Sequence, residues 1–390
     1  MKKNHIYEGN NIDVLKTFPD ESVDCVVTSP PYYNLRDYGT AEWEGGDENC
    51  KHIKRTQKQG GESNRPSKEL TIFQYDKVCK KCGAIRKDDQ LGLEETPQEF
   101  VDNLVKVFSE VKRVLKKEGT CWLNLGDSYY KKSLAGTPFR VAFALQSDGW
   151  YLRQDIIWHK PNPMPESVQD RCTKAHEYIF LLTKSPKYYY DIDAIREPLA
   201  ESSVGRLKQN IDKQVGTTRA NGGAKSNGNL KATGSIAKGR NKRSVWTITT
   251  KPYKEAHFAT FPIELPTYCI KAGCPEKVCK KCKKPVIKES YREKKLNVGF
   301  GNQHTPQGTH KKIGGKYQKF MEENPKKIVE KPTCNCNVGF EGGIVLDPFM
   351  GSGTTGLAAR NQQRNYVGID LNPEYIEIAE RRLQQLNLFI

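Results

Sequence analysis

The sequence has no long hydrophobic run. No stretch approaches the roughly 20 consecutive apolar residues that a membrane-spanning helix needs, and the opening residues, MKKNHIYEGN, lack the apolar core of a signal peptide. These two absences exclude membrane-spanning and secreted proteins. With 390 residues, the chain can form one large domain with insertions, or two domains. We therefore expect a cytoplasmic protein with no membrane partner.

Acidic residues are also scarce. The chain has 46 Asp and Glu residues against 63 Lys and Arg residues, which gives a formal net charge of +17. Val204–Arg243 holds ten basic residues and one acid, and Cys274–Thr333 holds sixteen basic residues and six acids. A basic composition alone is compatible with a protein that is merely soluble. Its concentration in two segments with few apolar residues favours contact with nucleic-acid phosphates.

Cysteine, by contrast, is plentiful, with twelve residues. Because an export signal is absent, we expect these cysteines to bind metal or to be buried, and we do not expect disulfides. Four of them lie in apolar surroundings that predict core packing: Cys25, Cys121, Cys172 and Cys269.

Most of the remaining cysteines form two Cys-x-x-Cys knuckles and two nearby pairs of ligand-type residues. A redox role would require a thioredoxin-like strand and helix around the knuckle, which neither Lys-flanked knuckle has. A knuckle supplies half of a tetrahedral thiolate site. We therefore predict two structural zinc ions. The first would bind Cys50, His52, Cys79 and Cys82, and the second would bind Cys279, Cys282, Cys334 and Cys336, with Cys274 as a substitute ligand.

Outside these insertions, apolar strands alternate with helices, which indicates an α/β fold. Strands are predicted at His5–Glu8, Asp24–Thr28, Cys121–Leu125, Ile156–His159, Tyr178–Thr183, Ile344–Leu346 and Tyr366–Ile369, and helices at Ile12–Phe18, near Pro138–Ser147, from about Thr354 and from Pro373. The best-marked helix follows the cap Thr96, and Gly119 is expected to end it. Residues 200–243 are predicted to be a loop or a segment that orders on binding.

A glycine-rich motif predicts a nucleotide-type cofactor. Gly351-Ser-Gly-Thr-Thr-Gly356 follows a predicted strand and opens a predicted helix, and Asp370 ends the next strand. The pattern is typical of a tight turn close to a ligand and of a carboxylate that binds ribose hydroxyls. The 34 residues after Gly356 are too few for a complete dinucleotide fold. We infer a circularly permuted sheet and a smaller adenosine cofactor; a glycine turn used only for packing is the alternative.

A second motif, Thr28-Ser-Pro-Pro-Tyr32, directly follows a predicted strand. Its two prolines fix an extended backbone and remove two N–H donors. The Ser29 hydroxyl and the Pro30 carbonyl are both acceptors, which suits them to an amino group, and the Tyr32 ring can stack on a planar base. On its own the motif is also common in ordinary loops.

In that order, Thr28–Tyr32 and Asp347-Pro-Phe-Met-Gly-Ser-Gly-Thr-Thr355 resemble the motifs of the β-class DNA amino-methyltransferases. The resemblance covers most of the chain outside the insertions and includes Trp122–Asp127, Ile157–Asn162, His176–Ile179, Arg243–Trp246 and His257–Pro262. It implies a circularly permuted, Rossmann-like methyltransferase fold of the α/β class, with a mostly parallel seven-stranded sheet and zinc-binding insertions. It also implies a prokaryotic or phage-encoded protein.

The resemblance implies the cofactor S-adenosylmethionine (SAM) and, position by position, its binding residues. Asp370 would hold the ribose, and Asp347 would support the methionine end. Asn10 stands where the family often has an acid that contacts the adenine. The remaining implied contacts are the cradle residues Phe349, Gly351, Ser352, Gly353 and Thr354, and the closing residues Thr260, Phe261 and Pro262.

The same resemblance implies the reaction. A base amine is a poor nucleophile, and acceptors at Ser29 and Pro30, on a backbone fixed by Pro31, would free its lone pair for direct methyl transfer. The base would be flipped out of the duplex and stacked on Tyr32. The chain contains no Pro followed by Cys, which excludes a ring-carbon cytosine methyltransferase of the Pro-Cys type.

The target amine and the partners follow from the family's preferences. Ser-Pro-Pro-Tyr members mostly act on cytosine N4 and Asp-Pro-Pro-Tyr members mostly on adenine N6, so Ser29 favours cytosine, with adenine as the alternative. An RNA or small-molecule methyltransferase, and a zinc-dependent nucleic-acid-binding protein with an inactive SAM fold, remain open. The partners implied are double-stranded DNA and a cognate restriction endonuclease, for either a monomer or a homodimer.

The predicted organisation is a catalytic domain interrupted by insertions. Residues 1–39, 96–186 and 341–390 form the catalytic domain, the last of these being its SAM-binding half. Residues 40–95 and 274–340 are the two zinc-knuckle insertions. Residues 187–256 are the predicted target-recognition region, and residues 257–273 carry the motif that closes over the cofactor.

Overall fold

The computed structural model describes residues 1–34, 41–52, 54–57, 72–75, 78–202, 204, 239–251, 260–293, 323–324 and 327–384. Most of the basic segment 204–243 and the start of the closing motif, residues 257–259, lie outside the described residues. The chain forms two units. Unit 1 comprises Met1–Tyr190, Ser244–Val278 and Phe340–Ile390, and unit 2 comprises Asp191–Arg243 and Cys279–Gly339.

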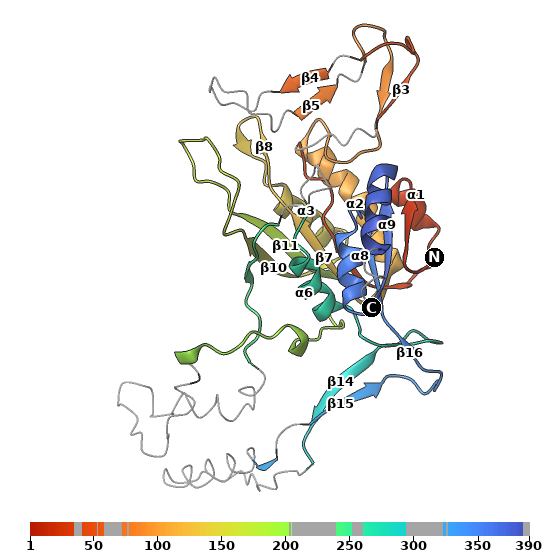
Figure 1. Ribbon diagram of the computed structural model, residues 1–390, viewed down its shortest axis with the longest axis vertical. Coiled ribbons are helices and arrows are strands. Elements are labelled where there is room, and N and C mark those ends of the chain that lie inside the picture. Colours follow the sequence, from red (N-terminus) through yellow and green to blue (C-terminus); the bar gives the residue numbers. More distant parts are fainter. Residues whose placement is uncertain are drawn as a thin grey trace. The chain divides into compact units, whose positions relative to one another are not determined.

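Unit 1 is built on an eight-stranded sheet (Figure 1). In spatial order its strands are β1 (His5–Glu8), β18 (Asn365–Asp370), β17 (Ile344–Asp347), β2 (Val23–Thr28), β7 (Leu115–Leu125), β11 (His176–Thr183), β10 (Tyr151–His159) and β12 (Val245–Thr247). All strands are parallel except β11, which is antiparallel to both of its neighbours. The mostly parallel α/β sheet predicted from the sequence is therefore confirmed, with β12 as a short additional strand beside β10.

The strand order confirms the predicted circular permutation. β17 and β18, which come last in the sequence, lie between β1 and β2, which come first. Val345 pairs with Cys25, and His5 pairs with Val367. Because all four strands are parallel, their carboxyl ends meet at one edge of the sheet. The catalytic-type motif after β2 and the glycine motif after β17 are thereby brought to the same edge.

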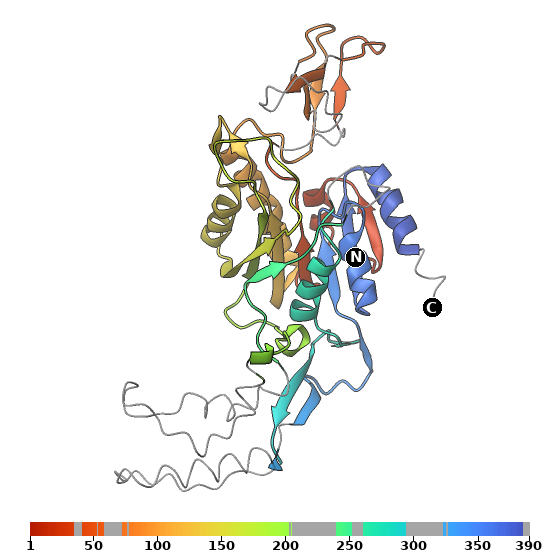
Figure 2. The same ribbon diagram turned by 60° about the vertical axis from the view of Figure 1, so that its left-hand side comes forward.

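Helices cover both faces of this sheet. The main hydrophobic cluster lies beneath α1 (Asn11–Lys16), α2 (Pro97–Val114) and α3 (Thr137–Ser147). On the other face, α6 (Glu264–Gly273) packs beside α8 (Thr354–Asn361), and α9 (Pro373–Gln384) contacts α8 (Figures 1 and 2). Side chains along β2 alternate between the faces: Val26 belongs to the main cluster, whereas Cys25 and Val27 do not.

The start of α2 was predicted correctly and its end was not. The Thr96 hydroxyl accepts from the Glu99 N–H at 3.2 Å, as a capping residue should. The helix ends at Val114, because the backbone becomes extended at the fully buried Leu115 and continues as β7. Gly119 therefore lies inside β7, where a Cβ atom would come within 2.5 Å of the Leu115 side chain.

Short antiparallel ribbons lie outside the central sheet, several of them in the insertions. In unit 1, β3 (Glu42–Glu44) pairs with β6 (Ile85–Lys87), β4 (Lys54–Gln57) with β5 (Ile72–Tyr75), and β8 (Tyr129–Tyr130) with β9 (Ser133–Leu134). In unit 2, β14 (Val286–Tyr291) pairs with β15 (Lys327–Pro332) (Figure 2), and a single helical turn spans Asp193–Ile195. Along the chain, β13 (Val278–Cys279) and β16 (Phe340–Glu341) flank the second segment of unit 2.

Three of the four cysteines predicted to pack in the core are buried: Cys25, Cys121 and Cys269. The prediction for Cys172 is wrong, because this residue is exposed in the polar loop between β10 and β11. Cys274 is fully buried in unit 1 and does not belong to either group of metal-ligand side chains. Within the described residues, no helix combines the length and the apolar character needed to cross a membrane.

Candidate active site and metal-ligand clusters

A cleft of about 130 Å³ opens at the carboxyl ends of β2, β17 and β18. Ser29 and Pro31 line it together with Phe349 and Asp370. Two motifs that lie more than 300 residues apart in the sequence thus share one cavity. Its other lining residues are Gly9, Asn10, Asn11, Asp89, Gln90, Leu91, Pro348, Leu371, Asn372 and Tyr375.

Asp347 ties the two motifs together. It is fully buried, and its carboxylate accepts hydrogen bonds from the hydroxyls of Thr28 and Thr355, each at 2.6 Å, and from the Phe349 N–H at 3.0 Å. Burial raises the pKa of Asp347 to about 6, against the lowering effect of these donors. The carboxylate therefore joins the end of β2 to the glycine loop and to α8.

The glycine loop is held by Asp370. The carboxylate of Asp370 accepts from the Gly351 N–H at 2.7 Å and from the Asn372 N–H at 2.9 Å, and burial raises its pKa. Gly351 and Gly353 have φ values of +50° and +79°, which favour glycine. At Gly353 a Cβ atom would also come within 2.9 Å of Ala379. This turn is the tight one that the motif predicts.

The predicted cofactor residues are distributed unevenly around the cleft. Asn10, Phe349 and Asp370 line it, and Asn10 also caps α1 through its side-chain oxygen. Ser352 and Thr354 are buried and accept from Arg382. The residues that do not line this cleft are Thr260, Phe261, Pro262, Asp347, Gly351, Ser352, Gly353 and Thr354. Their roles as SAM contacts stay predictions. The cleft itself fits an adenosine compound, because Phe349 and Leu371 offer apolar surface beside the Asp370 carboxylate.

A polar network surrounds Ser29 and Tyr32. The Ser29 hydroxyl donates to the Tyr32 hydroxyl at 3.1 Å, and the Tyr32 hydroxyl donates to the Glu177 carboxylate at 2.5 Å. Asn124 Nδ2 lies 2.7 Å from the Tyr32 oxygen, 2.8 Å from Glu177 and 3.3 Å from Ser29. Lys160 pairs with the other oxygen of Glu177. The buried side-chain oxygen of Asn124 has no hydrogen-bond partner among the described residues.

Asn124, Lys160 and Glu177 are the functional candidates that sequence reasoning missed. Asn124 lies near the end of β7, Lys160 directly follows β10, and Glu177 lies near the start of β11. These three strands are neighbours in the sheet, on the side of β2 that carries β7. Two signals were available. The three residues lie in segments that the resemblance covers, and Asn124 interrupts an apolar run in a strand that is buried on both faces. Gly126 is a further constraint, since a Cβ atom there would come within 2.6 Å of the Tyr32 ring.

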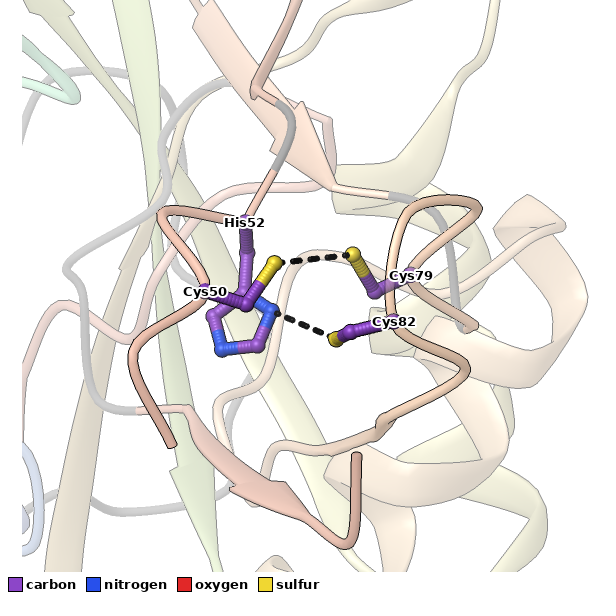
Figure 3. A group of neighbouring side chains, drawn as sticks. All are labelled: Cys50, His52, Cys79 and Cys82. Atoms are coloured by element: carbon purple, nitrogen blue, oxygen red, sulfur yellow. Dashed lines mark hydrogen bonds between the residues drawn. The ribbon is translucent and has the colours of Figure 1, made fainter. Parts of the chain in front are cut away.

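The first metal-ligand cluster consists of Cys50, His52, Cys79 and Cys82 (Figure 3), whose ligand atoms all lie within 4.8 Å of one another. The Cys50 and Cys79 sulfurs are 4.0 Å apart, and the Cys82 sulfur is 3.7 Å from His52 Nδ1. Tetrahedral zinc with bonds of about 2.3 Å to sulfur places sulfurs about 3.8 Å apart. The two separations are close to those around a tetrahedral zinc ion.

The second cluster, in unit 2, contains Cys279, Cys282, Cys334 and Cys336 within the same 4.8 Å limit. Its knuckle repeats the hydrogen bonds of the first. The N–H of the leading cysteine donates to the carbonyl five residues later, and its carbonyl accepts from the N–H four residues later. A hydrogen bond from the Cys282 N–H is the largest of the effects that lower the pKa of the Cys279 thiol to about 6. The lowered pKa favours the thiolate, the form that binds metal.

Comparisons with known proteins agree with this geometry. The chain matches the model of a family described as DNA methylase (N6_N4_Mtase) over residues 23–279 and 278–381. The Type II methyltransferase M.Cfr9I of Citrobacter freundii is 34% identical over 97% of this chain and 87% of its own length. M.SmaI of Serratia marcescens is 31% identical, with 97% and 90% covered. The solved structure of the PvuII DNA methyltransferase (cytosine-N4-specific) has a TM-score of 0.51 and 16% identity, covering 98% of this chain and 86% of that one, a likeness of fold.

Proposed function

Because this chain belongs to the DNA methylase family, whose members transfer a methyl group from SAM to a base amine, we propose that it methylates the N4 amine of cytosine in duplex DNA. One observation carries the proposal: Ser29 and Pro31 share a cleft with Phe349 and Asp370. Ser29, the first of the two acceptors assigned below to the amine, and the residues suited to an adenosine cofactor therefore line the same space.

The cofactor side of this proposal rests on the residues of the cleft. When bound, SAM supplies an electrophilic methyl group. Asp370, Phe349 and Leu371 line the cleft. In this proposal the Asp370 carboxylate would hold the ribose, and Phe349 and Leu371 would offer apolar surface to the adenine. Asp347 holds the glycine loop and the end of β2 in one arrangement, so the two halves of the site keep a fixed separation.

On the substrate side, Ser29 is the acceptor that we assign to the target amine. Its hydroxyl donates to Tyr32 and accepts from Asn124 at 3.3 Å, so one lone pair of the oxygen remains to accept a hydrogen of the amine. The Pro30 carbonyl is the second acceptor. Together they draw the amine out of conjugation with the ring, and preorganised contacts of this kind supply much of the catalysis.

The network behind Ser29 also provides a path for the proton that the amine loses. The amine N–H bond breaks as a proton passes to Ser29 Oγ, whose own proton passes to Tyr32 Oη and that of Tyr32 to Glu177 Oε2. The existing hydrogen bonds of 3.1 and 2.5 Å have this polarity. Lys160 pairs with the other oxygen of the Glu177 carboxylate that receives the proton.

Cytosine is proposed because residue 29 is a neutral serine, the residue that the resemblance associates with N4 activity. The test is expression in a host free of DNA methylation, with genome-wide mapping of modified bases and mass spectrometry of the nucleosides. N4-methylcytosine at a fixed sequence would support the proposal. N6-methyladenine would retain the chemistry and refute the base. Methylation of RNA or of small molecules alone would refute the DNA substrate.

We further propose that the two clusters bind structural zinc. The donor sets, the convergence within 4.8 Å and the repeated knuckle geometry support this assignment. Metal analysis of protein purified without chelator should find two zinc ions per chain, and Cys279→Ser should lower the content by one. Fewer than one zinc ion per chain would refute the proposal. A cognate restriction endonuclease is the partner we propose, and residues 187–256 remain the predicted target-recognition region.

A further inference from the structure

We propose that metal binding by the first cluster orders one wall of the cofactor cleft and thereby sets the affinity for SAM. The wall segment is Asp88–Gly92, which follows the cluster in sequence. The proposal rests on the metal and the cofactor assigned above. It distinguishes the two clusters, because only the first is placed in the same unit as the cleft.

The first step is the attachment of the cluster to the ribbon of β3 and β6. Trp43 on β3 stacks on the His52 ring, with centroids 4.0 Å apart and an interplanar angle of 13°. Gly46 lies so close to the knuckle that a Cβ atom would come within 2.9 Å of the Cys82 sulfur. The ribbon pairs Trp43 with Arg86. The cluster therefore holds β6 in two ways. Cys82 lies shortly before this strand in the sequence, and His52 stacks on Trp43 of the partner strand β3.

The second step leads from β6 into the wall segment. Arg86, on β6, forms an ion pair of 2.8 Å with Asp88, and both side chains are nearly buried, with exposures of 10% and 12%. The Asp88 carboxylate also accepts from the Gln90 N–H at 3.0 Å. Through these contacts, the position of the ribbon determines the positions of Asp88 and Gln90, which follow it in the chain.

The third step reaches the cleft and the catalytic loop. Asp89, Gln90 and Leu91 line the cleft that also contains Ser29 and Asp370. Gly92, at φ +94°, packs so tightly on the backbone after Pro31 that a Cβ atom would come within 2.8 Å of the Tyr32 carbonyl. Its carbonyl accepts from the Asn34 N–H at 2.7 Å. The wall segment thus touches the cofactor space and the Ser-Pro-Pro-Tyr loop together.

The described residues around the first cluster contribute little to a hydrophobic core. In 41–52 and 78–87, the parts of this insertion whose burial the structure describes, the buried residues are Cys79, itself a ligand, and Ala84. So little buried apolar surface in these two stretches does not offset the entropy of ordering them. Because binding of a structural metal ion contributes directly to the folding free energy of small domains, the metal would order the ribbon and the wall segment attached to it.

The test compares Cys82→Ser with Cys282→Ser, the equivalent change in the second knuckle. Both full-length variants should lose one metal ion per chain. Calorimetric titration with SAM should show affinity lowered at least about tenfold, or about 1.4 kcal/mol, in Cys82→Ser. Cys282→Ser should bind SAM within about twofold of the wild type. Unchanged affinity in metal-depleted Cys82→Ser, equal losses in both variants, or a wild type without metal in the first cluster would each overturn the proposal.

A second variant guards against misfolding of Cys82→Ser. Leu91→Ala changes the wall and none of the ligands, so it should retain both metal ions and still weaken SAM binding; unchanged affinity would exclude the wall segment from the site. Failure of the proposed function would give results that differ from failure of the wall proposal. A wild type that makes methyladenine and shows the same contrast between the cysteine variants would refute the cytosine assignment and support the wall. A wild type that fails to bind SAM would overturn both.

Discussion

Replacing Ser29 with alanine tests the proposed mechanism at the atom where it is most specific. If the Ser29 hydroxyl accepts a hydrogen of the target amine, Ser29→Ala removes one of the two acceptors that prepare the nucleophile. Loss of one preorganised contact of this kind costs about 10²–10³ in rate, or about 2.7–4 kcal/mol. Single-turnover methyl transfer should slow by that factor.

The structure predicts a much smaller effect on folding. The two hydrogen bonds of the Ser29 hydroxyl are long, 3.1 Å to Tyr32 and 3.3 Å from Asn124. After the substitution, Tyr32 and Asn124 still have each other and Glu177 as partners. No polar group loses its last partner, so the free energy of unfolding should fall by at most about 1 kcal/mol. The increase in the activation free energy of methyl transfer should therefore be severalfold larger than the decrease in the free energy of unfolding.

The assay is single-turnover transfer from labelled SAM to duplex DNA, with the product nucleoside identified by mass spectrometry and SAM affinity measured separately. Two variants of the neighbouring tyrosine separate its ring from its hydroxyl. Tyr32→Phe should slow turnover and still capture the flipped base, whereas Tyr32→Ala should weaken both. If Ser29→Ala turned over at nearly the wild-type rate, Ser29 would not be the acceptor and the assigned mechanism would be wrong.

Four further predictions follow from the site. Glu177→Gln leaves Lys160 without its carboxylate partner. Because the Glu177 and Lys160 side chains are 12% and 21% exposed, urea unfolding should show a loss of stability smaller than the about 3–5 kcal/mol of a fully buried pair. Turnover should fall while SAM affinity is kept, and unimpaired turnover would exclude the proton path. Asp370→Ala should weaken SAM binding far more than DNA binding, and equal losses would indicate a purely structural residue. DNA affinity should fall steeply between about 50 and 200 mM salt, and a flat response would contradict the predicted basic contact surface. Because burial raises the pKa of Asp347 to about 6, the wild type gains stability as the pH falls through 6, so its free energy of unfolding minus that of Asp347→Asn should rise from pH 7 to pH 5; a constant difference would show that the carboxyl stays ionised down to pH 5 and that its pKa is not raised.

The sequence predicts those features of the fold that local patterns encode. The strands of the central sheet, the start of α2 at its Thr96 cap and the permuted strand order all follow from apolar runs, capping residues and the position of the glycine motif. The end of α2 and the location of Cys172 do not. Leu115 and Cys172 each lie in a stretch whose local pattern fits the prediction. Tertiary packing makes the backbone extended at Leu115, and Cys172 is exposed because it lies in a loop.

The candidate site divides in the same way. The Ser-Pro-Pro-Tyr motif, the glycine loop and both metal-ligand clusters are continuous or regularly spaced, so their residue types predict their chemistry. Asn124, Lys160 and Glu177 come from three strands, and only the order and direction of β7, β10 and β11 bring them beside Tyr32. The wall segment has no sequence signature at all. Its place in the cleft depends on how the first insertion returns to the sheet.

The permuted sheet has a consequence for synthesis on the ribosome. The chain is made from its N-terminus, so β1 and β2 leave the exit tunnel long before β17 and β18, the two strands that lie between them. Until those strands emerge, β1 and β2 present unpaired edges facing a gap, and such edges readily join other chains. The Asp347 carboxylate that unites the two motifs is also absent until then. In a nascent or truncated chain the Ser-Pro-Pro-Tyr loop therefore lies in an incomplete site. The site is complete only after β17 and β18, the last strands to be synthesised, have joined the sheet.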